Sequence, residues 1–417
     1  MSVLPRRTAI SVFLVFAFAY FLSALLRAIT ATLAPALAQE FALQASDLGL
    51  LAGGYFLGFA ATQLPLGSWL DAHGPRKVLL GFLGVAVAGC LVFSVATGFT
   101  ALLAGRVLCG AGVSACLMAP LTGYRRWLDP VAQMRANSWM LMTGSLGMVA
   151  STLPVQWLLP VAGWRPLFWG LATLLVVSMG VLAVGVPGWH ARAQGPQPAP
   201  TAVPALSQGY AAVWRHPYFR RVAPLGFFTY GGMVAMQTLW AGPWMQRVAG
   251  YSPLESATGL FWINVSMLCA FWSWGMVNPW LQRRGLDADR IMTSGLPLGL
   301  LVLAGIVMAG PAAGSGAWAL FCVSCTSVAL TQPAVAMALP QALAGRALSA
   351  FNLVIFAGVF VVQWGIGLAV DAFEALDMPV VASFRAAMAV YLACNALAYG
   401  WFVRRAGRHN AVQTFAP

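Results

Sequence analysis

The sequence predicts an all-α membrane protein with twelve transmembrane helices in two pseudo-symmetric six-helix halves. Composition is the first reason, because 60% of the 417 residues are hydrophobic, 8% are charged, and the mean hydropathy is +0.79. A soluble globular protein carries about 25% charged residues, so that class is excluded. The other two reasons are a series of long apolar stretches and an internal repeat.

Apolar stretches long enough to cross a bilayer follow one another along the chain. A helix needs about 20 predominantly apolar residues to span the hydrocarbon core. Twelve stretches meet this length, and we expect spans at 9–36, 48–70, 78–97, 100–123, 135–160, 166–187, 222–246, 255–281, 291–310, 315–339, 348–370 and 384–403. No loop between them is long enough to hold a soluble catalytic domain.

The basic residues alternate between loops in a way that predicts topology. Cytoplasmic loops of membrane proteins carry an excess of lysine and arginine. With both termini cytoplasmic, only Arg165, Arg247 and Arg385 fall in loops on the opposite side, while Arg27 and Arg106 fall inside spans. The remaining 18 of the 23 basic residues face the cytoplasm. The net charge of +13 therefore reports topology, and a nucleic-acid partner has no support.

The acidic residues and the cysteines have opposite expected positions. We place all ten acidic residues in loops and all seven cysteines inside spans, where they act as small hydrophobic residues and not as disulfides. Arg27 and Arg106 then have no embedded carboxylate to pair with. Because an uncompensated cation in a span costs about 2.5–3.5 kcal/mol on insertion scales, a negatively charged substrate becomes the leading candidate partner.

Landmarks of the first half recur at a constant offset of 211 residues. The pairs are Arg135 with Arg346, Gly74 with Gly285, and Gly147 with Gly358. An offset close to half the chain length indicates two six-helix halves in parallel orientation. We expect an N-terminal half at 1–187, a cytoplasmic linker at 188–221 and a C-terminal half at 222–417. The glycine and proline residues at 195–200 favour an extended linker.

Two short motifs resemble those of the major facilitator superfamily of secondary transporters. Residues 67–80 read GSWLDAHGPRKVLL and look like the superfamily's signature between helices two and three. Residues 106–112 read RVLCGAG and are similar to its arginine-then-glycines pattern in helix four. Through helix number, repeat and orientation, the resemblance covers the whole chain. It identifies the superfamily well and the substrate poorly.

The signature loop predicts a conformational clasp on the cytoplasmic side. Asp71 can cap a neighbouring helix and pair with basic residues such as Arg76 and Lys77, and Gly74 permits the tight turn. The clasp would hold the halves together in one state and release them in the other. The alternative is a topological anchor only. We also assign Arg106 and Gly110 of the second motif to conformational change, and the motif leaves the role of Arg106 open.

Arg27 belongs to a polar stripe on the first span. Tyr20, Ser23, Arg27 and Thr30 recur at spacings of three and four, so they share one helix face. The Arg27 neighbourhood is similar to that of the superfamily's organic-anion symporters, which implies an arginine that binds a substrate carboxylate. Their preceding acidic residue is absent, and Leu26 stands in its place. The alternative for Arg27 is a guanidinium satisfied by backbone carbonyls.

Further polar residues lie on spans that the resemblance places around the central cavity. Besides Arg27 and Tyr20, we expect substrate contacts from Tyr55, Gln63, Tyr230, Gln237, Trp240, Asn264, Gln332 and Asn352. For each of these residues taken alone, a helix-to-helix hydrogen bond is the simpler interpretation. The argument for a binding site is their joint concentration on these spans.

Other functions have weaker support in the sequence. Drug exporters of the superfamily typically carry a membrane acid and a glycine-proline motif in helix five, and the stretch at 144–150 lacks that pair. A Cu(I) importer would use soft sulfur ligands, which are Met233, Met236, Met267, Met276, Cys322 and Cys325, but packing is the default explanation for these residues. An enzyme would need a nucleophile with a base, or paired carboxylates, at membrane depth, and neither occurs.

We therefore expect a secondary transporter in the cytoplasmic membrane that moves a small organic anion by rocking of the two halves around a midplane site. We expect no cofactor, metal or catalytic residue, and one chain is enough to form a pathway through the bilayer. No nucleotide-binding loop occurs, so a gradient must supply the energy. The substrate's identity, the direction of transport, the coupling ion and the oligomeric state stay open.

Overall fold

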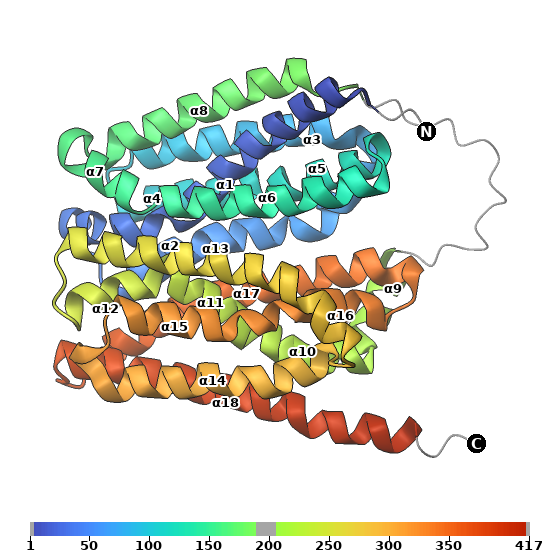
Figure 1. Ribbon diagram of the computed structural model, residues 1–417. Coiled ribbons are helices and arrows are strands. Elements are labelled where there is room, and N and C mark those ends of the chain that lie inside the picture. The colour runs from blue at the N-terminus through green and yellow to red at the C-terminus, as the bar shows by residue number, and fades with distance from the viewer. Residues whose placement is uncertain (1–3, 189–205, 414–417) are drawn as a thin grey trace. The chain divides into compact units, whose positions relative to one another are not determined.

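The computed structural model describes residues 4–188 and 206–413, which are mostly helical and contain no strand (Figure 1). The helices of the first half are α1 (Arg6–Phe41), α2 (Ala45–Ala61), α3 (Gln63–Ser94), α4 (Phe99–Val113), α5 (Ala115–Trp127), α6 (Pro130–Ala150), α7 (Leu153–Ala162) and α8 (Trp164–Gly185). Those that follow are α9 (Leu206–Arg215), α10 (Pro217–Pro224), η1 (Leu225–Tyr230), α11 (Gly231–Ala235), η2 (Met236–Trp240), α12 (Ala241–Arg247), α13 (Pro253–Arg283), α14 (Ala288–Ala309), η3 (Gly310–Ala312), α15 (Ser315–Cys325), η4 (Thr326–Leu330), α16 (Thr331–Ala338), α17 (Gln341–Glu374) and α18 (Val380–Gln413).

All twelve expected spans fall on helices. Within the described residues, nine helices are long and apolar enough to cross a membrane, and a bent pair in α6 and α7 makes ten. The other two expected spans are interrupted helices. The span at 48–70 breaks at Thr62 between α2 and α3, and the span at 222–246 is divided by the π-helical segments η1 and η2. The chain is therefore a multi-pass membrane protein.

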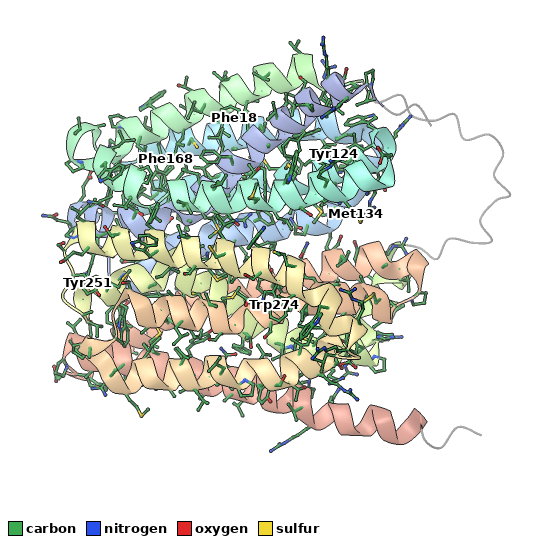
Figure 2. All side chains as sticks on the ribbon, in the orientation of Figure 1. Phe18, Tyr124, Met134, Phe168, Tyr251 and Trp274 are labelled. Carbon is green, nitrogen blue, oxygen red and sulfur yellow. The ribbon has the colours of Figure 1, made fainter. Side chains whose placement is uncertain are left out.

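Among the described residues, the first compact unit contains 4–43 and 50–188. Within it, α1 packs against α6 and α8, while α3 packs against α4 and α8 (Figure 1). Phe168 of α8, labelled in Figure 2, stacks on Phe93 of α3 with ring centroids 4.1 Å apart. These contacts surround α1, which carries Arg27, with the other helices of the same unit.

The second compact unit contains, of the described residues, 44–49 and 206–413. Here α17 packs against η1, α11 and α16, and α14 packs against α15 and α18. The expected linker at 188–221 lies partly outside the described residues, including the proline-rich stretch at 195–200. The last part of the linker is helical and consists of α9 and the start of α10 at Pro217. Helix α9 packs on α17. The linker and half boundaries that we expect stay a prediction.

Glycines related by the 211-residue offset have the same structural role in both halves. Gly74 and Gly285 both adopt a left-handed backbone, with φ of 77° and 76°. A Cβ on Gly147 would lie 2.3 Å from the carbonyl oxygen of Phe21, and a Cβ on Gly358 would lie 2.2 Å from that of Phe227. Each glycine of the second pair thus permits a backbone-to-backbone approach of two helices.

The expectation that every acidic residue lies in a loop is wrong. Seven of them lie within helices, near the ends or beside the kink at Gly74: Glu40, Asp47, Asp71, Glu255, Asp289, Asp371 and Glu374. The physical reason is that helices continue beyond the apolar stretch, where acids can cap backbone N–H groups. Asp371, for example, accepts hydrogen bonds from the backbone N–H groups of Ala45 and Ser46 at 3.0 and 2.8 Å.

Candidate functional site

The polar stripe of α1 faces the interior of the first unit. Tyr20, Ser23 and Thr30 are buried, and Arg27 is partly exposed. The Ser23 hydroxyl donates to the carbonyl oxygen of Val113 in α4 at 3.4 Å. The helical periodicity of the sequence therefore identified an inward-facing surface whose one charged group, Arg27, is still accessible.

Arg27 is held by aromatic residues and has donor capacity to spare. Its guanidinium interacts electrostatically with the hydroxyl groups of Tyr20 and Tyr55, and its Cζ lies 5.8 Å from the centroid of the Phe59 ring. The Nε atom has no hydrogen-bond partner among the described residues, and the side chain forms no ion pair there. A planar guanidinium suits a carboxylate or sulfonate because two parallel N–H···O bonds can form.

Tyr55 of α2 connects Arg27 to its surroundings. The ring is fully buried, and its hydroxyl donates to the carbonyl oxygen of Ser23 at 3.2 Å. The Cζ atom of Arg106 lies 5.0 Å from the centroid of the same ring, within the range of a cation–π contact. A Cβ on Gly110 would lie 1.8 Å from the Tyr55 carbonyl oxygen, so glycine is needed there for the close approach of α4 to α2.

Arg106 joins α4 to α1 beside Arg27. Its side chain is 1% exposed, and Nη1 donates to the carbonyl oxygen of Leu26 at 2.9 Å. Its Nε and Nη2 atoms have no hydrogen-bond partner in the described part of the chain. Arg106 is thus closed to a ligand in this conformation, yet it fixes the helical turn that carries Arg27. Both guanidinium groups contact Tyr55, and their combined positive charge favours an anion at the exposed one.

Two further residues of this unit are Gln63, which the sequence predicted as a substrate contact, and Gly144, which it did not. The Gln63 side chain is buried and its amide donates to the carbonyl oxygen of Phe59 one turn earlier, and its contact with a substrate stays a prediction. Gly144 of α6 was not predicted to matter here. A Cβ on it would lie 2.5 Å from the Tyr20 ring, so its lack of a side chain makes room for that tyrosine. The signal in the sequence is its spacing of three residues from Gly147.

In the second unit, the predicted amide residues occur in hydrogen-bonded pairs. Gln237 donates to Asn264 at 2.9 Å, and Gln332 donates to Asn352 at 2.6 Å. These bonds join helices, as the simpler interpretation of such residues predicts. Both acceptors and Gln237 are buried, and Gln332 is only partly exposed. Contact of these amides with a substrate stays a prediction.

The two predicted aromatic residues of this unit differ in accessibility. Trp240 is fully buried and its indole N–H donates to the carbonyl oxygen of Gln363 at 3.0 Å, so it offers no free donor in this conformation. Tyr230 is partly exposed at the end of η1. Their roles as substrate contacts stay predictions.

The π-helical segments η1 and η2 were not predicted. Such segments are rare and often lie at functional sites, because they shift the register of side chains along a helix. Tyr230 ends the first segment, and Gln237 and Trp240 lie in the second. Gly226, Gly231 and Gly232 break the apolar run of this span, which is the only local signal for an irregular helix.

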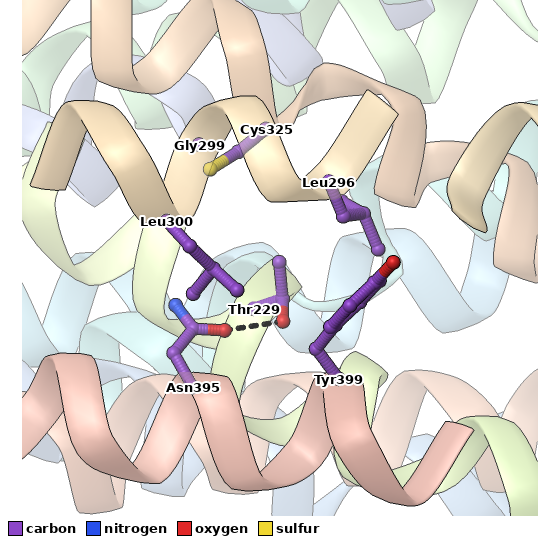
Figure 3. A pocket seen from close by; sticks show the side chains of 7 residues that line it. All are labelled: Thr229, Leu296, Gly299, Leu300, Cys325, Asn395 and Tyr399. Carbon is purple, nitrogen blue, oxygen red and sulfur yellow. Dashed lines mark hydrogen bonds between the residues drawn. The ribbon is translucent and has the colours of Figure 1, made fainter. Parts of the chain in front are cut away.

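A small pocket between η1, α14, α15 and α18 is lined mainly by apolar groups (Figure 3). Thr229 donates to Asn395, whose amide donates to the Tyr391 hydroxyl at 3.1 Å, and the Tyr399 hydroxyl donates to the carbonyl oxygen of Thr293 at 2.7 Å. These polar groups satisfy one another. We therefore interpret the pocket as a packing gap between helices and not as a ligand site.

The signature loop adopts the turn that its glycine predicts. Gly74 has a positive φ, and Arg76 donates to the carbonyl oxygen of Val186 at 3.4 Å. Asp71 and Lys77 are exposed, and Asp71 forms no ion pair with any described residue. The charge clasp around Asp71 stays a prediction.

Comparison with known proteins identifies the family. The sequence profile of the Major Facilitator Superfamily matches residues 16–363, which is more than four fifths of the chain. Similar proteins include the facilitated glucose transporter member 10 of Mus musculus (29% identical, 34% of this chain, 27% of that protein). Others are a probable sulfoacetate transporter of Cupriavidus necator (24%, 56% and 56%) and a probable L-galactonate transporter of Escherichia coli K12 (22%, 54% and 46%). The chain thus matches between about a quarter and just over half of the length of these relatives.

Solved structures agree on the fold. A bacterial homolog of the human lysosomal transporter Spinster superimposes with a TM-score of 0.79 at 15% identity, covering 96% of this chain and 97% of that one. A D-xylose–proton symporter gives a TM-score of 0.75 at 14% identity, covering 94% and 97%. The predicted two-half, twelve-helix major facilitator fold is confirmed. The cytoplasmic placement of the termini stays a prediction.

Proposed function

Because the chain belongs to the Major Facilitator Superfamily, we propose that it is a secondary transporter of small organic anions in the cytoplasmic membrane. Transport would proceed by alternating access, with a gradient as the energy source and one chain as the working unit. The observation that carries the anion specificity is the environment of Arg27. The Arg27 side chain is partly exposed, its buried Nε atom has no hydrogen-bond partner, and it has no carboxylate partner among the described residues.

The chemistry around Arg27 favours an anion over a neutral sugar. Two tyrosine hydroxyls and the Phe59 ring surround the guanidinium without neutralising its charge. A cation at bilayer depth that lacks a counter-ion is costly, and an anionic ligand removes that cost. The names of two relatives, for sulfoacetate and L-galactonate, support the same class of substrate. The glucose transporter among the relatives defines the alternative, which is a neutral polyol.

Ligand-induced thermal stabilisation of the purified protein tests this proposal. The panel contains sulfoacetate, L-galactonate, glucose, a cationic drug and Cu(I), so that the drug-export and copper alternatives are included. A ligand at 100 times its dissociation constant stabilises a protein by about 2.7 kcal/mol, which is readily measured. We expect the two anions to stabilise the parent protein and the other ligands to have no effect.

The decisive variant is Arg27→Gln, with Arg165→Gln as the matched control. Both changes remove one arginine of the first unit, and only Arg27 lies in the α1 stripe. We expect Arg27→Gln to abolish the response to anions and Arg165→Gln to keep it. If Arg27→Gln responds like the parent, Arg27 is a structural residue and the proposed substrate class is wrong. Stabilisation by glucose alone would favour the neutral-polyol alternative.

A further inference from the structure

Helices α3 and α4 approach each other through glycines. A Cβ on Gly89 would lie 2.6 Å from the backbone N of Cys109, and a Cβ on Gly105 would lie 2.9 Å from the backbone N of Phe93. Gly112 is closer still, because a Cβ there would lie 2.2 Å from the backbone N of Ala86. Three glycines along one seam therefore bring the two backbones into contact.

This close approach brings two cysteine sulfurs together. The Sγ atoms of Cys90 in α3 and Cys109 in α4 are 3.7 Å apart, and both residues are fully buried. The other described cysteines form no sulfur–sulfur contact, and Cys322 and Cys325 lie one turn apart on a single helix. No third metal-ligating side chain gathers with the pair in the described part of the chain, so a metal site has no support.

Arg106 adds a smaller electrostatic influence to a thiol pair whose chemistry depends first on burial and on the contact between the two sulfurs. It lies one turn before Cys109 on α4, and its guanidinium interacts electrostatically with both cysteines. The Nε and Nη2 atoms of Arg106 have no hydrogen-bond partner among the described residues. The thiolate is the nucleophile in thiol oxidation, and a neighbouring guanidinium stabilises that negative charge. Oxidation-sensitive cysteines are commonly poised next to a second, resolving cysteine.

We propose that Cys90 and Cys109 are a redox modification site, converted by bilayer-soluble organic hydroperoxides into a disulfide that links α3 to α4. One thiolate attacks the terminal peroxide oxygen, which gives a sulfenic acid and releases the alcohol. The second thiol attacks the sulfenic sulfur, which forms the S–S bond and releases water. In total, two thiols and one hydroperoxide give one disulfide, one alcohol and one water.

The disulfide affects the turn that carries Arg106. A disulfide bond is about 2.05 Å long, so the two sulfurs must come closer by about 1.6 Å. Movement of Cys109 shifts α4 one turn away from the bond between Arg106 and the Leu26 carbonyl oxygen. That bond fixes the turn of α1 with Arg27. We infer that oxidation weakens anion binding, and this consequence rests on the proposed function.

Thiol counting after oxidation tests the modification site without reference to any substrate. The full-length protein in lipid nanodiscs is treated with cumene hydroperoxide, denatured, alkylated and analysed by mass spectrometry. We expect the number of alkylated thiols to fall from seven to five, with peptides of Cys90 and Cys109 joined, and to return to seven after reduction. In Cys90→Ser and Cys109→Ser, no joined peptide should form, because a sulfenic acid on the remaining cysteine has no partner thiol, and reduction should return all six thiols to the alkylatable form.

The exposed Cys269 provides the contrast. If the peroxide oxidises Cys269 while Cys90 and Cys109 stay alkylated, access decides reactivity and the proposal is wrong. In the Cys90→Ser variant, a disulfide between Cys109 and another cysteine would show that Cys90 is not the partner, and this result would also overturn the proposal.

The binding consequence is measured as the dissociation constant of sulfoacetate, which we expect to rise about tenfold on oxidation, the factor for one lost hydrogen bond. If reduced protein ignores sulfoacetate, the proposed function fails, and the thiol count still decides the modification site. If the disulfide forms and sulfoacetate binding is unchanged, only the inferred link to Arg27 is wrong.

Discussion

Gly147→Ala should separate α6 from α1 at the turn that precedes Arg27. The new Cβ would lie 2.3 Å from the Phe21 carbonyl oxygen, 2.9 Å from the Ala24 Cβ and 3.2 Å from the Leu25 backbone N. Ordinary contacts are about 3.5 Å, so the helices must move apart by about 1 Å. All three atoms belong to the backbone or to a Cβ, and no side-chain rotation relieves the overlap.

The net cost follows from two opposing effects. Overpacking a tight interface typically costs about 1–3 kcal/mol, and a clash with backbone belongs at the upper end. Replacing glycine by alanine inside a helix returns about 1 kcal/mol through helix propensity. We therefore expect Gly147→Ala to lower the free energy of unfolding by about 2 kcal/mol. Gly358→Ala should behave alike, because its Cβ would lie 2.2 Å from the Phe227 carbonyl oxygen.

Gly170→Ala in α8 is the matched control. Gly170 is exposed and a Cβ there would meet no atom within 4 Å, so only the propensity gain of about 1 kcal/mol applies. Thermal or denaturant unfolding of the three variants in one detergent measures the difference, which we expect to be about 3 kcal/mol between Gly147→Ala and Gly170→Ala. Equal stability of these two variants would refute the close-packing argument.

Three other substitutions follow from polar contacts. Glu40→Gln breaks an ion pair of 2.6 Å with Arg165, and the two side chains are 38% and 40% exposed. The free energy of unfolding should therefore change by less than about 1 kcal/mol. A larger loss would show that the pair is shielded from water. Asp289→Asn leaves the guanidinium of Arg221, which is 6% exposed, without its carboxylate partner. The free energy of unfolding should fall by about 3 kcal/mol. A change as small as that for Glu40→Gln would contradict the argument from burial. Gln237→Ala removes the donor to Asn264. It should raise the dissociation constant of the hydroxyl-rich L-galactonate by up to about tenfold and leave that of sulfoacetate unchanged. Equal effects on both anions would argue against recognition of hydroxyl groups by this amide.

The parts of the structure that the sequence predicted depend on local periodicity. Apolar runs of sufficient length located all twelve spans, and the spacing of Tyr20, Ser23 and Arg27 identified one face of α1. Gly74 predicted a turn because glycine tolerates a positive φ. In each case, the residues that decide the conformation lie within a few positions of one another, so no tertiary information is needed.

Tertiary partners and helix irregularities were out of reach for the same reason. The bond from Arg106 to the Leu26 carbonyl joins residues 80 positions apart, and a backbone acceptor leaves no mark in the sequence. The acidic residues were misplaced because the apolar runs end before the helices do. The π-helical segments η1 and η2 depend on packing against α17, α11 and α13, and the glycines nearby do not specify the type of irregularity.

The cysteine pair shows how a correct local assignment can miss a tertiary relation. Each cysteine was assigned to a span, and all seven lie in helices. Their contact depends on the turn between α3 and α4, which places two residues that are 19 positions apart in the sequence opposite each other on the two helices. The glycines at 89 and 105 carried this information, because a helix pair without side chains at the seam must approach closely.

The two compact units divide the polar chemistry of the chain unequally. In the first, Arg27 has a charge without a carboxylate partner in the described part of the chain, and two tyrosine hydroxyls interact with it electrostatically. In the second, Gln237 and Gln332 are paired with asparagines and carry no charge. A guanidinium discriminates anions from neutral molecules, whereas an amide recognises hydroxyl groups whatever the net charge of their owner. Selection of ligands by charge should therefore depend on the first unit, and selection among anions by their hydroxyl groups on the second.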